Sequence, residues 1–162
     1  MEALVIYHTI SGHTKRAAED IAAGLSEAGA AATLAAAGEL GDLDVGKFGV
    51  VVIGSPCHAG SLAIRSGVCG PVLGVLKRLK ATKLPGVVGG AFAVHCTYGG
   101  HRTVARIEKA LRAAGADVPE PGVVVTAGVP FSLFTGPMAS DAARQELREL
   151  GKALADAATQ TE

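Results

Sequence analysis

The sequence predicts an α/β protein built on a doubly wound, five-stranded parallel sheet. Short apolar runs alternate with longer amphipathic or alanine-rich segments, which is the pattern of repeated βα units around a parallel sheet. The apolar runs are continuous, so each predicted strand is expected to be covered by helices on both faces. With 162 residues, 49% of them hydrophobic, the chain fits one domain, residues 1–162, and can bury a sizeable core.

Five segments are predicted to be strands because each is short and rich in apolar residues. The clearest is the uninterrupted run Val50–Ile53, whose β-branched side chains favour the extended conformation. In chain order, the predicted strands are Ala3–Tyr7, Ala31–Ala35, Gly49–Gly54, Val87–Val94 and Gly122–Thr126.

Four longer segments are predicted to be helices: Thr14–Ala28, Ile64–Lys80, Gly100–Ala114 and Ser140–Ala158. The second range is interrupted by Gly70 and Pro71, which disfavour a helix interior. The last begins with Ser140 and Asp141, residues typical of a helix N-terminus, and has leucines at helical spacing. Gly38–Phe48 is predicted to hold at most one short helix.

Composition excludes several classes of protein. The N-terminus lacks the basic and long apolar regions of a secretory signal, and no apolar stretch approaches the roughly 20 residues of a membrane helix. The three cysteines have no CxxC spacing, so we expect reduced thiols rather than a disulfide framework or a zinc ribbon. These observations favour a cytoplasmic protein without a membrane partner.

The formal charge is zero, but the charges are unevenly distributed. No acidic residue lies between Asp44 and Glu108, and this interval carries the basic residues Lys47, Arg65, Lys77, Arg78, Lys80, Lys83, Arg102 and Arg106. Nucleic-acid binding would require such residues to be interleaved with stacking aromatics, yet the chain has no Trp, two Tyr and four Phe. We therefore predict no nucleic-acid partner.

The first predicted strand leads into a hydroxyl-rich turn and then a helix. Unpaired backbone amides and a partial positive charge at a helix start form an anion site, and the hydroxyls of Thr9, Ser11 and Thr14 can add hydrogen bonds. A phosphate monoester fits such a site. The segment matches neither GxxxxGK[ST] nor GxGxxG, which disfavours nucleoside triphosphates and classical dinucleotides. The alternative is that these hydroxyls only cap the helix.

At these residues the chain resembles the flavodoxin family. The specified positions of that family's N-terminal FMN-phosphate motif are filled by Val5, Ile6, Tyr7, Thr9, Gly12, Thr14, Ala18 and Ile21. The resemblance extends more weakly over almost the whole chain, through Gly54–Pro56 and Thr97–Gly100. It implies the strand order 2-1-3-4-5, with FMN bound where the order reverses.

The resemblance also implies that Ser55–Gly60 and His95–Gly100 enclose the isoalloxazine ring, with Tyr98 as the stacking candidate and His58 where an aromatic residue often lies. The alternative for Tyr98 is a surface turn residue. The cofactor-binding residues predicted in this way are Thr9, Ile10, Ser11, Gly12, His13, Thr14, Ser55, Pro56, Cys57, His58, Ala59, Gly60, His95, Cys96, Thr97, Tyr98, Gly99 and Gly100.

Histidines and cysteines gather after the predicted strand ends, at His8, His13, His58, His95, His101, Cys57 and Cys96. Imidazole and thiolate are good zinc or copper ligands. However, these residues do not have the spacing of a known metal motif, and a flavin would occupy the same space. Loop histidines that are exposed or hydrogen-bonded are the preferred interpretation, so we predict no metal site.

The predicted loops along this edge, 9–16, 55–65, 95–102 and 127–139, contain no Asp or Glu, whereas typical flavodoxins are strongly acidic there. Carboxylates near a flavin disfavour its fully reduced anion. We therefore expect a less negative second reduction potential. Phe131 and Phe134 in the last loop are candidates for covering a flavin, receiving a substrate ring or contacting a partner, with plain packing as the alternative.

Three functions remain open. The first is electron transfer through bound FMN to a redox partner protein or small molecule, which requires no catalytic acid or base. The second is an FMN-dependent NAD(P)H reductase acting on a quinone or similar acceptor; the acid-free loops suit a phosphorylated donor, but Ala59 stands where that branch usually has an aromatic. The third is a flavin-free interaction module. The sequence favours the first and leaves enzymatic activity and oligomeric state open.

Overall fold

The computed structural model describes residues 1–57, 67–96, 99–127 and 138–160. Its elements are β1 Glu2–Tyr7, α1 His13–Glu27, β2 Ala31–Ala36, the short 3₁₀ helix η1 Val45–Lys47, β3 Val50–Pro56, α2 Gly70–Leu79, β4 Val88–His95, α3 Gly100–Ala114, β5 Val123–Thr126 and α4 Asp141–Thr159. The five strands form one parallel sheet in the order β2-β1-β3-β4-β5. The predicted fold class and strand order are confirmed.

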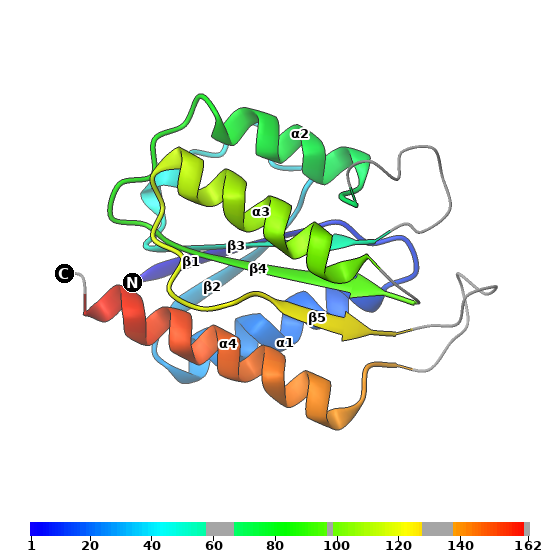
Figure 1. Ribbon diagram of the computed structural model, residues 1–162. Helices are drawn as coiled ribbons and strands as arrows, with labels where there is room; N and C mark the ends of the chain where they lie inside the picture. The colour runs from blue at the N-terminus through cyan, green and yellow to red at the C-terminus, as the bar shows by residue number, and fades with distance from the viewer. Residues whose placement is uncertain (58–66, 97–98, 128–137, 161–162) are drawn as a thin grey trace.

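Helices cover both faces of the sheet, with α1 and α4 on one side and α2 and α3 on the other (Figure 1). Strand β1 shows how the sequence divides its side chains between the two faces. Leu4 and Ile6 belong to the core beneath α2 and α3, whereas Ala3 and Val5 belong to the core beneath α1 and α4. Because successive residues of a strand point to opposite faces, a continuous apolar run supplies both cores at once.

One predicted boundary is wrong. The helix expected at Ile64–Lys80 begins only at Gly70, after Cys69 as N-cap and with Pro71 in its first turn. Proline fixes φ near the helical value and lacks an amide hydrogen, so it suits the first turn better than the interior. Gly67, with φ of 66°, is not helical. The other predicted strands and helices are present, with ends that differ by no more than two residues.

The backbones of helices α1 and α4 approach each other closely where the two helices cross. A Cβ added to Gly24 would lie 2.0 Å from the backbone oxygen of Arg148, and one added to Gly151 would lie 2.3 Å from the backbone oxygen of Ile21. Only glycine at both positions allows this approach. The helices are also joined by Asp20 of α1, which is 6% exposed and ion-paired with Arg144 of α4 at 3.0 Å.

Gly54, near the carboxyl end of β3, leaves room for the ring of Phe92 on the neighbouring strand. It pairs in register with Phe92 of β4, and a Cβ added to it would lie 1.9 Å from a ring atom of that fully buried phenylalanine. The largest side chain of the core therefore lies against the strand just before it leaves the sheet. No described helix is both long and apolar enough to cross a membrane.

Candidate functional site

The carboxyl ends of β1, β3 and β4 lie along one edge of the sheet, and α1 and α3 begin at the same edge (Figure 1). Because β1 and β3 are adjacent but their following helices lie on opposite faces, the chain order reverses between them. Such a switch point leaves a crevice outside the strand ends, where doubly wound proteins bind ligands. The described residues of the predicted segments, 9–14, 55–57, 95–96 and 99–100, all belong to this edge.

A hydrogen bond to the Thr9 side chain closes the turn between β1 and α1. The backbone amide of Gly12 donates to Thr9 Oγ1 at 2.9 Å. Gly12 itself has φ of 87°, a conformation that non-glycine residues rarely adopt. Because the Thr9 oxygen acts here as an acceptor, its hydroxyl hydrogen remains able to donate to a ligand. Thr9 and Gly12 therefore shape the turn that ends at the start of α1.

Among the residues that the structure describes, no side chain caps or neutralises the N-terminus of α1. Its N-cap residue is Gly12, no side chain caps it, and its first turn contains no acidic residue. Thr14, the second residue of the helix, is buried, with 2% of its surface exposed. The first amides of a helix and the positive end of its dipole together favour a bound anion. Capping of α1 by a side chain, the alternative left open by the sequence, is not seen in the structure.

Helix α3 begins in the same way. Its N-cap is Gly99, with φ of 96°, no side chain caps it, and no acidic residue lies in its first turn. A Cβ on Gly99 would lie 2.6 Å from Cys57 Sγ, so the chain after β3 packs directly against the start of α3. Two helix starts of positive potential therefore face the same edge of the sheet.

Ser55 is fully buried at the end of β3, and its hydroxyl is already engaged within the protein. It accepts a hydrogen bond from the amide of Cys69 at 3.1 Å and donates to the carbonyl of Pro56 at 2.9 Å. These bonds connect β3 to the start of α2. The amide of Cys57 donates in turn to the carbonyl of Val94 at 2.8 Å. The Ser55 hydroxyl therefore serves to hold the end of β3 to the start of α2.

The histidines do not form a metal centre within the described residues. No group of three His, Cys, Asp or Glu side chains there is arranged to hold an ion. His95 lies with its Nε2 at 3.2 Å from Thr126 Oγ1, and His13 begins α1. The three cysteines are all described and form no disulfide.

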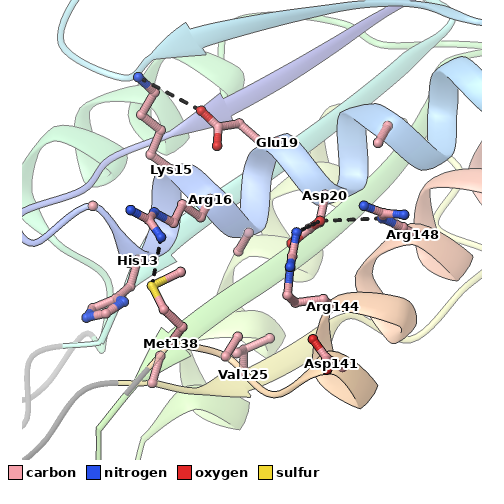
Figure 2. Close-up of a pocket in the computed structure, with 15 residues that line it drawn as sticks. His13, Lys15, Arg16, Glu19, Asp20, Val125, Met138, Asp141, Arg144 and Arg148 are labelled. Atoms are coloured by element: carbon pink, nitrogen blue, oxygen red, sulfur yellow. Dashed lines mark hydrogen bonds and ion pairs between the residues drawn. The ribbon is translucent and has the colours of Figure 1, made fainter. Parts of the chain in front are cut away.

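A cavity of about 900 Å³ extends from the start of α1 along its contact with α4 (Figure 2). In it, the Asp20 carboxylate accepts hydrogen bonds from Arg144 Nε at 3.0 Å, Arg144 Nη2 at 3.2 Å and Arg148 Nε at 3.4 Å. The hydrogen bonds and charge of Asp20 raise the pKa of the Arg144 guanidinium above its ordinary value. Arg16 Nη1 lies 3.0 Å from Met138 Sδ at the end nearest the start of α1.

The three arginines that line this cavity, Arg16, Arg144 and Arg148, were not predicted from the sequence. Asp20 and Arg144 lie 124 residues apart in the sequence, and their pairing depends on how α1 packs against α4. The sequence signal for Arg16 was present in the adjacent cations Lys15 and Arg16, just after the hydroxyl-rich turn. Predicted residues outside the described part of the chain are His58, Ala59, Gly60, Thr97, Tyr98, Arg65, Phe131 and Phe134.

Comparisons with solved structures find the same fold in flavodoxins. An archaeal flavodoxin is 22% identical with a TM-score of 0.77, over 98% of this chain and 99% of that one. Oxidised Flavodoxin 1 from Bacillus cereus is 14% identical with a TM-score of 0.79, over 96% and 98%. The flavodiiron protein from Giardia intestinalis is 18% identical with a TM-score of 0.77, over 99% of this chain but 36% of that one.

No protein-family model matches the chain, and no curated protein sequence matches it significantly. The strand order and the matching structures define the class of this protein, a doubly wound α/β protein. Helices α1 and α3 begin at the edge of the sheet where the strand order reverses. More particularly, the chain has the flavodoxin-like fold, in agreement with the resemblance carried by its N-terminal motif.

Proposed function

We propose that this protein binds FMN at the carboxyl edge of its sheet and transfers electrons through it. The observation that carries the proposal is the start of α1, where helix amides without a side-chain cap lie beside the Thr9–Gly12 turn and the buried residue Thr14. A phosphate monoester carries about two negative charges at neutral pH and three acceptor oxygens, which is the complement of this set of donors.

The residues present fit FMN in two respects. Amides of segment 12–14 and the hydroxyls of Thr9, Ser11 and Thr14 hold the phosphate, and no described residue of the turn or of the first turn of α1 is acidic. Segments 55–60 and 95–100 enclose the ring, and their mutual packing through Cys57 and Gly99 supports a shared binding edge. Backbone groups of these segments orient the ring's polar edge.

When bound, the flavin supplies the one- and two-electron chemistry, and the protein supplies binding, orientation and electrostatics. The protein contributes a fixed binding site for the phosphate and a positive electrostatic potential from the N-termini of α1 and α3. No catalytic residue is assigned, since electron transfer to a partner requires only an exposed part of the ring. The partner is a redox protein or a small-molecule donor or acceptor in the cytoplasm, a compartment that suits three cysteines without a disulfide.

The alternative, an FMN-dependent NAD(P)H reductase, is favoured by one observation. Exposed His101 and Arg102 lie in the first turn of α3, beside the proposed ring site, where they suit a phosphorylated nicotinamide donor. The carrier function has the additional support that flavodoxins match this chain over nearly their whole length.

An anaerobic spectrum separates the two functions. The protein loaded with FMN is mixed first with excess NADH or NADPH and then with dithionite, and the visible flavin bands are followed. A carrier keeps its bands until dithionite is added, whereas a reductase is bleached quickly by one nicotinamide cofactor. A chain that never retains FMN contradicts both functions.

A further inference from the structure

We propose that Arg16 binds the phosphate group of FMN and makes the site selective for the phosphorylated flavin over riboflavin. This inference rests on the proposed function and adds a residue to the site that neither the motif nor the fold assigns. It follows from the charges around the start of α1 and from the direction in which the Arg16 side chain extends.

The cations near the start of α1 differ in their partners. Lys15 lies 3.9 Å from the Glu19 carboxylate, and Arg144 and Arg148 share the carboxylate of Asp20. Arg16 has no carboxylate partner among the described residues, and its Nη1 lies 3.0 Å from the thioether of Met138. A thioether sulfur is a weak acceptor. Of these four cations, Arg16 is therefore the one best able to exchange its present weak acceptor, the Met138 sulfur, for a phosphate oxygen.

The position of Arg16 directs it toward the anion site. Side chains of an α-helix lean toward its N-terminus, and Arg16 lies in the first turn, where its amide donates to the carbonyl of Gly12. Figure 2 shows the guanidinium extending back toward the start of the helix, beside His13. The same cavity is lined by Gly12 and His13, so Arg16 and the free amides border one continuous space.

The charge balance explains why a phosphate would recruit this side chain. A helix N-terminus carries only about half a positive charge, against about two negative charges on a phosphate monoester. A guanidinium adds a full charge and up to two parallel hydrogen bonds to phosphate oxygens. Riboflavin lacks the phosphate, so Arg16 contributes nothing to its binding.

The test compares Arg16→Gln with Lys15→Gln, a matched control that removes a neighbouring charge already paired with Glu19. Binding of FMN, riboflavin and inorganic phosphate is measured for both variants and for the unsubstituted protein by flavin fluorescence and competition. Arg16→Gln is expected to weaken FMN binding about tenfold, to weaken phosphate binding in parallel and to leave riboflavin affinity unchanged. Lys15→Gln is expected to change FMN affinity less than about twofold.

Two further readouts separate phosphate recognition from a structural role. FMN affinity of the unsubstituted protein should fall more steeply with ionic strength than that of Arg16→Gln, because one charge pair is lost. Arg16→Lys should recover part of the affinity. Equal weakening of FMN and riboflavin, or unchanged FMN affinity in Arg16→Gln, overturns the inference while leaving the proposed function intact. Failure of the unsubstituted protein to bind FMN overturns both.

Discussion

The amide of Gly12 donates a hydrogen bond to Thr9 Oγ1 at 2.9 Å, which closes the turn between β1 and α1. The bond uses the threonine oxygen as an acceptor and holds Gly12 in its positive-φ conformation at the head of the helix. Turn shape and ligand binding therefore depend on the same side chain, because the hydroxyl hydrogen of Thr9 stays available for a phosphate oxygen.

Replacing Thr9 by valine, which keeps the shape but removes the hydroxyl, should weaken FMN binding about five- to tenfold, corresponding to about 1 kcal/mol for one hydrogen bond. A fluorescence titration of FMN measures the loss. Thr33→Val makes the same chemical change at an exposed position of β2 and should leave FMN affinity unchanged. Equal affinities for Thr9→Val and the unsubstituted protein would contradict the assigned role of Thr9.

Gly54→Ala should destabilise the fold by about 3 kcal/mol, because the new methyl group would overlap the ring of Phe92 in a fully packed core. Gly74→Ala is the matched control. Gly74 lies in α2, and a Cβ there meets no atom within 4 Å. This control should stabilise the protein by about 0.5–1 kcal/mol through helix propensity. Urea denaturation measures both changes, and destabilisation by Gly74→Ala or none by Gly54→Ala would refute this packing.

The pair between Glu27 of α1 and Lys152 of α4 should make stability depend on pH in the acid range. The Lys152 hydrogen bond and charge lower the pKa of the Glu27 carboxyl below its ordinary value of 4.5. A lowered folded-state pKa means that the stabilisation is present above pH 4.5 and is lost as the pH falls through the folded-state pKa.

Urea midpoints of the unsubstituted protein and Glu27→Gln should therefore differ slightly at pH 7 and converge on acidification. Glu39→Gln, which removes a carboxylate from the loop after β2, serves as the control for nonspecific charge effects. A difference for Glu27→Gln that persists unchanged into acid would argue against the pair.

Charges near the proposed ring site should set the second reduction potential of bound FMN. The described residues at the ends of β3 and β4 and at the start of α3 include no carboxylate, and the start of α3 carries a positive dipole end. Arg102→Glu should make the second potential more negative, since a new carboxylate disfavours the fully reduced anion. Arg106→Glu, one turn further along α3, should have a smaller effect. Anaerobic potentiometric titration measures both, and equal shifts would exclude a local charge effect.

The sequence was sufficient for the parts of this structure that depend on local chemistry. Continuous runs such as Val50–Ile53 predicted strands buried on both faces, and Thr9, Gly12 and Thr14 predicted the turn and helix start at which the candidate site lies. Local propensity and hydroxyl placement act over a few residues, so they can be recognised without knowledge of packing.

Features that depend on long-range packing were not predictable in this way. The engagement of the Ser55 hydroxyl by Cys69 requires the chain to return to the end of β3, and the ion pair of Asp20 with Arg144 requires α1 to lie against α4. The predicted start of α2 is too early because Gly70 and Pro71, which interrupt the predicted helix, form the first turn of the observed one.

The most direct test of the central claim is gel filtration of the purified protein after incubation with equimolar FMN or riboflavin, with visible spectra recorded on the protein peak. Binding through a phosphate at the start of α1 predicts that FMN elutes with the protein, that riboflavin elutes largely free, and that dithionite bleaches the bound flavin reversibly. FMN eluting entirely free of the protein, or riboflavin retained as well as FMN, would contradict that claim.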